Sequence, residues 1–332
     1  MSKVNVAIVG ATGMVGRTFL EVLQERNFPI KNLYLFASKR SAGKKVKFNN
    51  KEYEVEELTE NSFNKDIDIA LFSAGGEISK KFAPIARDNG VIVVDNSSAW
   101  RMDKDIPLVV PEVNPEDIKW HKGIISNPNC STIQCVVPLK PLNDAFGIKR
   151  IIFSTYQAVS GSGVGGMKDL ENGIKGLENK KYPHQIAFNC LPHIDVFMDN
   201  DYTKEEMKMI EETKKILNDH DLKITTTAVR VPVNYGHSVS VNIEFNNSFE
   251  INDLIEKLKS TEGIIIQDDP RKNIYPLATN AEGTDDVYIG RIRRDYSIEN
   301  GVNMWVVADN IRKGAATNTV QIAELLLQEY FI

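Results

Sequence analysis

The stretch Val4–Gln24, VNVAIVGATGMVGRTFLEVLQ, decides the fold class, because it reads as a buried strand, a glycine turn and a helix in direct succession. Gly10, Gly13 and Gly16 form a GxxGxxG pattern, a variant of the dinucleotide fingerprint. Glycines let the backbone approach a pyrophosphate, and the helix N-terminus supplies N–H groups and a favourable dipole. A tight turn without a ligand is the alternative, but the position between strand and helix favours nucleotide binding.

The next predicted strand, Leu33–Ala37, is not followed by the acidic residue that would bind the ribose 2′-hydroxyl of NAD. Ser38, Lys39, Arg40 and Ser41 stand in that place. A cationic turn with hydroxyl groups suits a 2′-phosphate, so this turn predicts NADP as the cofactor. A solvated basic turn is the alternative, since further lysines follow.

Strands alternate with helices up to about residue 128, with further strands expected at Ile69–Phe72, Val91–Val94 and Ile124–Ser126. This order predicts a doubly wound parallel sheet. From Lys149 onward the strands lengthen and alternate apolar with polar residues, as in an antiparallel sheet with one exposed face. We therefore predict an α/β fold, in which a dinucleotide-binding domain at 1–129 precedes an α+β domain at 130–313 with a mainly antiparallel sheet.

One cysteine, Cys130, lies in SNPNCSTIQ (126–134) beside the apolar run Ile133–Leu142. The orphan N–H groups and dipole of a helix N-terminus favour a thiolate, which is the form that attacks carbonyl carbon. A buried structural cysteine is the alternative. Downstream, the predicted strand pair in AVRVPVNYGHSVSVNIEF (228–245) carries Arg230 and His237. A histidine with a pKa near ~6.5 could accept the proton of the thiol.

The composition is ordinary for a soluble enzyme of two domains, with 332 residues and a net charge of −5 that gives no sign of nucleic-acid binding. Three cysteines without CxxC or HxxxH spacing suit reduced thiols in a cytosol and predict no metal site. No apolar run approaches the ~18 residues of a membrane span, and the N-terminus leaves no room for a signal peptide. We expect a cytoplasmic protein.

The chain resembles the aspartate-semialdehyde dehydrogenase family over nearly its whole length. The similar segments are the glycine turn, SNPNCSTIQ, STYQAVSGSG (154–163), NCLPHIDVF (189–197), RVPVNYGH (230–237) and ADNIRKGAATNTVQIAELL (308–326). That family reduces L-aspartyl-4-phosphate with NADPH to L-aspartate 4-semialdehyde and phosphate, in the biosynthesis of lysine or diaminopimelate, threonine and methionine. The resemblance further implies a homodimer, and a final helix, Ala315–Tyr330, that returns to the nucleotide domain so that residues 314–332 complete it.

The resemblance also implies roles for individual residues. Cys130 would be the nucleophile, His237 the acid/base for its proton, and Gln157 the residue that orients the substrate. The implied substrate ligands are Arg230 for the α-carboxylate, Glu205 for the α-ammonium, and Arg101, Lys208 and Asn129 for phosphate. The implied cofactor contacts are Gly10, Thr12, Gly13, Met14, Val15, Gly16, Ser38, Arg40, Ser41, Ser160, Gly161 and Asn318. For Glu205 and Lys208, which are three residues apart on a predicted helix, a surface ion pair is the alternative.

Other functions remain possible from the sequence alone. N-acetyl-glutamyl-phosphate reductase and glyceraldehyde-3-phosphate dehydrogenase also combine a dinucleotide domain, a nucleophilic thiol and a downstream histidine. The sequence around Cys130 and His237 suits them poorly. A non-catalytic NADPH-binding sensor is a further alternative, and the joint presence of Cys130, Gln157, Arg230 and His237 argues against it. SGSGVGG (160–166) lacks the Lys and Ser/Thr of a P-loop, so we expect a mobile active-site loop there, followed by a linker to residue 186.

Overall fold

The computed structural model describes residues 2–331, so residues 1 and 332, the outer ends of the predicted nucleotide domain, lie outside it. The chain divides into two compact units, of which the first runs to Asn129 and resumes at Ala315, and the second is Cys130–Gly314. Each unit has its own sheet, with strand order β3-β4-β2-β1-β5-β6-β7 in the first and β11-β12-β13-β10-β8-β9 in the second.

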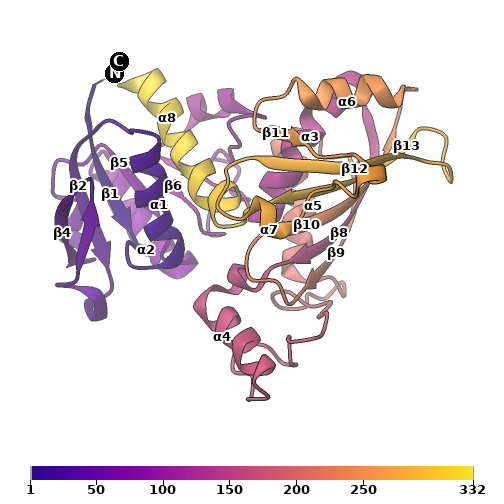
Figure 1. Ribbon diagram of the computed structural model, residues 1–332. Helices are drawn as coiled ribbons and strands as arrows, with labels where there is room; N and C mark the ends of the chain where they lie inside the picture. Colours follow the sequence, from indigo (N-terminus) through magenta and orange to yellow (C-terminus); the bar gives the residue numbers. More distant parts are fainter. Residues whose placement is uncertain (1, 332) are drawn as a thin grey trace. The chain divides into compact units, whose positions relative to one another are not determined.

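The sheet of the first unit is parallel except for the edge strand β3. Its strands are β1 (Val4–Val9), β2 (Ile30–Ala37), β3 (Lys45–Phe48), β4 (Lys51–Glu57), β5 (Ile69–Phe72), β6 (Ile92–Asp95) and β7 (Ile124–Ser126). Its helices are α1 (Met14–Glu25), α2 (Gly76–Asp88) and α8 (Asn318–Tyr330), and α8 lies beside α1 and β6 (Figure 1). Strand order reverses between β1 and β5, which is where doubly wound sheets bind ligands.

Both faces of β1 are buried, which explains its continuous run of buried residues. Val6 and Ile8 pack in one core with residues of α1 and α8, while Ala7 and Val9 pack in another with residues of α2. Alternate side chains of one strand therefore hold a helical layer on each side of the sheet.

The strands β3 and β4 were not predicted, and the lysines after Ser41 had suggested only a solvated basic turn, as the alternative to a phosphate site. They form an antiparallel hairpin in which Lys45 pairs with Glu54 and Phe48 with Lys51. Asn49 and Asn50, with φ of +46° and +62°, form the turn, as two-residue hairpin loops require. The second strand also begins earlier than predicted, at Ile30.

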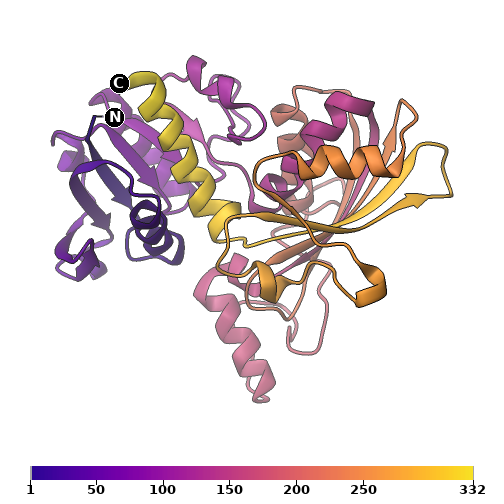
Figure 2. The same ribbon diagram turned by 45° about the horizontal axis from the view of Figure 1, so that its top comes forward.

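The second unit has a mixed, mainly antiparallel sheet with three helices packed together on one of its faces (Figure 2). Its strands are β8 (Ile148–Gln157), β9 (Lys223–Arg230), β10 (His237–Phe245), β11 (Ile264–Ile266), β12 (Val287–Asp295) and β13 (Gly301–Ala308). Its helices are α3 (Cys130–Phe146), α4 (Gly163–Ile174), α5 (Lys204–Ile216), α6 (Ile251–Lys259) and α7 (Ala278–Ala281). Helix α3 contacts α5, α6 and three central strands, whereas α4 extends away from the sheet.

Two sequence predictions for the second unit are wrong. The strands β9 and β10 do not pair with each other, because β8 lies between them. Residues 159–174 are not a mobile loop but a short 3-10 turn followed by α4, in which Gly166 is needed for close packing: a methyl group there would lie 2.5 Å from the Val159 carbonyl oxygen. The final helix ends at Tyr330 as predicted, but its first residues belong to a π-helical turn at Arg312–Thr317, and the α-helix begins at Asn318.

Candidate active site

Three predicted site residues lie at one end of three adjacent strands. Gln157 ends β8, and Arg230 is its register partner at the end of the parallel strand β9. His237 begins β10, which runs antiparallel on the other side of β8. The carboxyl end of a strand lies beside the carboxyl end of a parallel neighbour and the amino end of an antiparallel one. The sheet therefore gathers residues that are up to 80 positions apart along the chain.

The peptide of Ala158 holds two of these side chains. Its N–H donates to Nδ1 of His237 over 3.0 Å, and its carbonyl oxygen accepts a 2.7 Å hydrogen bond from Nη1 of Arg230. Both side chains are buried, and the Nε atom of Arg230 has no partner among the described residues. The backbone of Ala158 thus holds the guanidinium of Arg230 and the imidazole of His237 side by side.

His237 is fully buried, and its ring is held in one tautomer. Because Nδ1 accepts the Ala158 N–H, the proton of the neutral ring lies on Nε2, which has no partner within residues 2–331. Burial, reinforced by the charge of Arg230 and opposed by that of Glu205, lowers the pKa of His237 to about 3. The expectation of a histidine with an ordinary pKa is therefore wrong, because the buried ring of His237 is neutral.

Cys130 is the first residue of α3, as predicted, and its position is fixed from two sides. One turn later on the same helix, the buried Gln134 amide donates to the carbonyl oxygens of His237 and Val306 at 3.1 and 3.3 Å. This ties the helix of the cysteine to the strand of the histidine. Gly314 packs directly on the cysteine, since a methyl group there would lie 2.8 Å from Cys130 Cβ.

The other two cysteines are placed differently. Cys135 is fully buried within α3, and burial raises the pKa of its thiol. Cys190 is exposed in the segment before α5. Among the three, only Cys130 combines partial exposure with a helix N-terminus.

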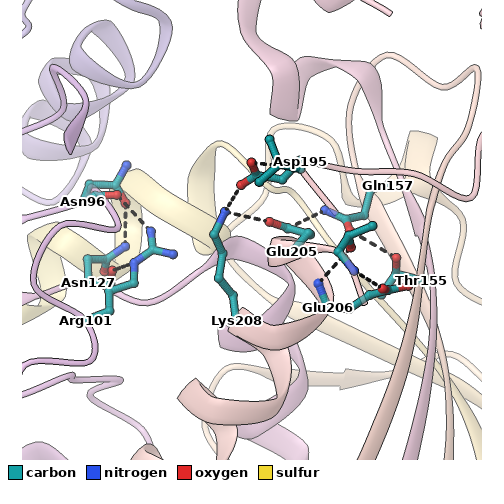
Figure 3. Close-up of polar contacts among 11 residues, drawn as sticks. Asn96, Arg101, Asn127, Thr155, Gln157, Asp195, Glu205, Glu206 and Lys208 are labelled. Carbon is teal, nitrogen blue, oxygen red and sulfur yellow. Dashed lines mark hydrogen bonds and ion pairs between the residues drawn. The ribbon is translucent and has the colours of Figure 1, made fainter. Parts of the chain in front are cut away.

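A charged cluster extends the site toward α5 (Figure 3). Gln157 donates to Oε1 of Glu205 over 3.1 Å, and Lys208 donates to Oε2 of the same carboxylate over 3.1 Å. Glu205 is buried, so this is not an ordinary surface pair. Glu206 anchors the helix by accepting from the Ala228 N–H of β9 and from the N–H of Thr203, its N-cap residue.

Arg101 belongs to a separate network in the first unit (Figure 3). It is buried and donates to the carbonyl oxygens of Asn127 and Asn96 at 2.9 and 3.0 Å. The Asn318 amide at the start of α8 donates to Oδ1 of Asn127 over 2.7 Å. Asn129 is also buried, at the last position before the second unit.

The glycine turn of the first unit has the shape that a dinucleotide needs. Gly10 has φ of +90°, and a Cβ there would lie 2.4 Å from the Ser73 carbonyl oxygen. A Cβ at Gly16 would lie 2.2 Å from the Gly10 oxygen, so glycine permits the close approach of α1 to the turn. Gly13 caps α1 without a side-chain hydrogen bond, and the first helical turn, which begins with Met14 and Val15, has no acidic residue.

The basic turn after β2 contacts this glycine turn. Thr12 donates to the Ser41 hydroxyl over 3.3 Å, whereas Ser38 and Arg40 are exposed. An accessible cation therefore follows β2 at the place where the adenosine ribose lies in doubly wound dinucleotide-binding folds.

The cofactor residues expected in the second unit lie next to His237. The Ser160 hydroxyl accepts from Asn310 over 3.0 Å, and Asn310 accepts from the Gly236 N–H. A methyl group at Gly161 would lie 2.9 Å from Nη1 of Arg230 and 3.2 Å from Nε2 of His237. The turn at residue 161 must therefore be small.

Four residues of the site were not predicted from the sequence: Gln134, Ala158, Asp195 and Gly314. A glutamine inside an apolar helix was a usable signal for the first, because a buried amide needs partners. The other three act through backbone groups, small size or a tertiary ion pair, which residue type alone does not reveal.

Two family profiles match the chain. One, described as semialdehyde dehydrogenase, NAD binding domain, covers residues 5–121, and the other, semialdehyde dehydrogenase, dimerisation domain, covers residues 139–313. Together with the fold and the site they define the class, the semialdehyde dehydrogenases.

Individual relatives narrow the class. The chain is 60% identical over 337 residues to an aspartate-semialdehyde dehydrogenase of Aquifex aeolicus, covering 98% of this chain and 99% of that one. A crystal structure of aspartate semialdehyde dehydrogenase II from Vibrio cholerae, complexed with ASA, matches with a TM-score of 0.96 and 51% identity over 100% of both chains. A Candida albicans enzyme solved with NADP matches with a TM-score of 0.80 and 28% identity over 100% of both. The chain belongs to the aspartate-semialdehyde dehydrogenase family.

The predicted fold class, enzyme class and activity are confirmed: the chain is an oxidoreductase of amino-acid biosynthesis with aspartate-semialdehyde dehydrogenase activity, an NAD(P)-binding domain and a dimerisation domain. Within residues 2–331, no helix is long and apolar enough to cross a membrane. The same residues contain no cluster of three or more His, Cys, Asp or Glu that could hold a metal ion.

Proposed function

We propose that this chain converts L-aspartyl-4-phosphate to L-aspartate 4-semialdehyde through a thioester on Cys130. The observation that carries the proposal is a set of hydrogen bonds. Those of Ala158 hold Arg230 and His237, and that of Gln134 connects the strand of His237 to the helix of Cys130. A guanidinium that can bind a carboxylate, an imidazole, and a nucleophile on a helix that is bonded to the strand of the imidazole are the parts that acyl transfer from an amino-acid substrate needs.

Cys130 supplies the covalent step. Its thiolate attacks the acyl carbon, phosphate leaves with the electron pair of the broken C–O bond, and a thioester remains. Backbone N–H groups at the start of α3 are suited to stabilise the oxyanion that forms on the way. A thioester accepts hydride more readily than a carboxylate, so covalent catalysis divides one hard reduction into two easier steps.

The substrate is held at its charged ends. Arg230, whose Nε is unsatisfied within the described chain, would bind the α-carboxylate, where a planar guanidinium can form two hydrogen bonds. Glu205 would bind the α-ammonium, and Gln157, which already donates to Glu205, would orient the reacting group. Arg101, Lys208 and Asn129 would bind the phosphate.

His237 would act as the acid/base for the proton of the Cys130 thiol, which must leave before the thiolate attacks. While the ring is neutral, its Nε2–H can donate a hydrogen bond to the developing oxyanion. Because Nε2 already carries the ring proton, accepting the thiol proton would place a second proton on Nδ1 in place of the hydrogen bond from Ala158, and burial and Arg230 oppose the cationic ring that results. A substrate carboxylate on Arg230 would offset that positive charge, so we expect His237 to become a competent base only when substrate is bound.

NADP is the cofactor that the first unit fits, by the cradle at Gly10 and the cationic turn after β2. When bound in its reduced form, NADPH, the cofactor would supply the hydride that reduces the thioester. The backbone from Gly10 to Gly16, with Thr12, Gly13, Met14 and Val15, would hold the pyrophosphate, Ser38, Arg40 and Ser41 the 2′-phosphate, Ser160 and Gly161 the nicotinamide, and Asn318 the far edge. A homodimer through the second unit and a location in the cytoplasm complete the proposal.

The test is the reverse reaction, followed as NADPH formation from NADP, with L-aspartate 4-semialdehyde, N-acetylglutamate semialdehyde or glyceraldehyde 3-phosphate. Phosphate-dependent turnover with the first compound alone is the expected result. Turnover with N-acetylglutamate semialdehyde would favour the reductase alternative. Binding of NADPH without turnover of any of the three would favour the sensor.

A further inference from the structure

Lys208 is shared by two carboxylates from different segments (Figure 3). Its Nζ lies 3.1 Å from Oε2 of Glu205 and 2.8 Å from Oδ2 of Asp195. Burial would lower the pKa of Lys208, but the charge of Glu205 and the contacts with Asp195 outweigh it and raise the pKa. Lys208 therefore stays an ammonium, and the three groups together carry a net charge of −1.

Asp195 is built into this position by its backbone. It has φ of +70°, a conformation that residues other than glycine rarely adopt. Its second oxygen, Oδ1, accepts the Val196 N–H over 2.9 Å, and the Val196 carbonyl accepts the N–H of Lys204, the first residue of α5. The segment from Asp195 is thus tied to the start of the helix that carries Glu205 and Lys208.

The charges decide what the cluster can bind. A pair made only of Glu205 and Lys208 is neutral, so a carboxylate neutralised by its own lysine would have little attraction for a second cation. Asp195 supplies the additional negative charge and draws Lys208 from the other side. Other charges lie around the cluster. Lys204 is exposed and has a smaller effect on Asp195, both oxygens of Glu206 accept backbone N–H groups, and Arg230 acts with Glu205 on the shared neighbour His237.

We propose that Asp195 is a positioning residue which, by engaging Lys208, leaves Glu205 with the negative charge that recognises the substrate's α-ammonium. The proposal deepens the proposed function, on which it rests for the role of Glu205. It assigns selection for α-amino substrates to a residue that need not touch the substrate. The site then has a cationic end at Arg230 for the carboxylate and a net anionic end for the ammonium.

Asp195→Asn is the variant to test. Asparagine tolerates a positive φ and can still accept the Val196 N–H, so the substitution removes the charge and keeps the shape. Asp201→Asn is the matched control, because Asp201 is exposed and has a similar φ of +65° in the same segment. Succinic semialdehyde is the probe, since it equals the substrate without the ammonium. Measured as a competitor of L-aspartate 4-semialdehyde, it gives an inhibition constant whether or not it is turned over.

We expect Asp195→Asn to raise the KM for L-aspartate 4-semialdehyde, because the cluster loses the negative charge that attracts the ammonium. The rise should be only about fivefold, since the partly exposed charge of Asp195 is screened by solvent. The inhibition constant of succinic semialdehyde should not change. Asp201→Asn should change neither. If Asp195→Asn weakens both compounds equally, or weakens neither, the proposal is wrong, because a structural role does not distinguish an ammonium.

Glu205→Gln separates this failure from failure of the proposed function. If Glu205→Gln selectively weakens L-aspartate 4-semialdehyde while Asp195→Asn does not, Glu205 binds the ammonium without help from Asp195. If neither variant distinguishes the two compounds, the role proposed for Glu205 is itself wrong. A Tm measurement on each variant separates loss of folding from loss of recognition.

Discussion

The two units of this chain build their sites in opposite ways. In the first unit the glycine turn is contiguous, and Gly10 to Gly16 follow one strand and open one helix. In the second unit the groups come from α3, β8, α5, β9 and β10, and hydrogen bonds through Ala158 and Gln134 join them. A contiguous site is specified by local backbone conformation, whereas a dispersed site depends on strand register. Substitutions in the first unit should therefore act through the local backbone conformation, and substitutions in the second unit through contacts between distant segments.

The largest effect is expected from Cys130→Ala, which removes the nucleophile but leaves the frame around it. Turnover should fall by about 10⁴-fold or more, as for other covalent catalysts that lose their nucleophile. Steady-state NADPH formation from semialdehyde, phosphate and NADP measures it. Cys190→Ala, at an exposed position, is the control and should keep full activity. Full activity in the Cys130 variant would falsify the thioester mechanism.

Gly10→Ala should damage the first unit by clash as well as by backbone strain. A Cβ there meets the Ser73 oxygen at 2.4 Å, whereas Gly90, with a similar φ of +82°, has no atom within 4 Å of that position. Gly90→Ala should lower the free energy of unfolding by about 1 kcal/mol, and Gly10→Ala by about 3 kcal/mol or more. Urea unfolding of both variants measures the difference. Equal losses would mean that the turn relaxes and that its tight shape is not required.

Arg101 and Arg230 compare the units directly, because the proposal gives one the phosphate and the other the carboxylate. In the reverse reaction Arg101→Leu should raise the KM for phosphate more, and Arg230→Leu the KM for semialdehyde more. Each loss is expected to cost about 2 kcal/mol of binding, roughly 30-fold. Lysine should rescue only in part, since it keeps the charge but loses the planar fork. A shift of both constants by the same factor in both variants would contradict this division.

His237 should make the protein sensitive to acid. Its pKa is lowered to about 3 by burial and Arg230, against about 6.5 in an unfolded chain, so the unfolded state binds the proton first as pH falls. The stability that the neutral, buried His237 contributes is fully present above pH ~6.5 and is lost as the pH falls toward ~3. In His237→Asn the free energy of unfolding should therefore fall less steeply between these values, by about 1.4 kcal/mol per pH unit. Urea titrations at several pH values test this, with exposed His220→Asn as control. Parallel curves for wild type and His237→Asn would show that His237 is not buried neutral.

The smallest effect is expected at the exposed Arg40. Arg40→Ala should raise the KM for NADPH about five- to tenfold, because an exposed ion pair is screened by solvent. Any activity with NADH should change less, since only NADPH carries the 2′-phosphate. Kinetics with both cofactors measure this. An equal loss with the two would make the basic turn structural.

The sequence by itself determined what depends on neighbours along the chain. The alternation of strands and helices to residue 128 predicted the parallel sheet, and Cys130 was predicted at the helix N-terminus where it lies. The hairpin at β3 and β4 was missed because its lysines resemble a solvated turn, and α4 because its glycines, needed for close packing, resemble a flexible loop.

Only the tertiary structure decided how the dispersed groups act. The insertion of β8 between β9 and β10 brings Gln157, Arg230 and His237 to one end of the sheet. Burial then shifts the pKa of His237, and a strained turn brings Asp195 to Lys208. Charge, burial and hydrogen bonding between distant segments depend on distances in space, and a residue's type and local pattern do not contain those distances.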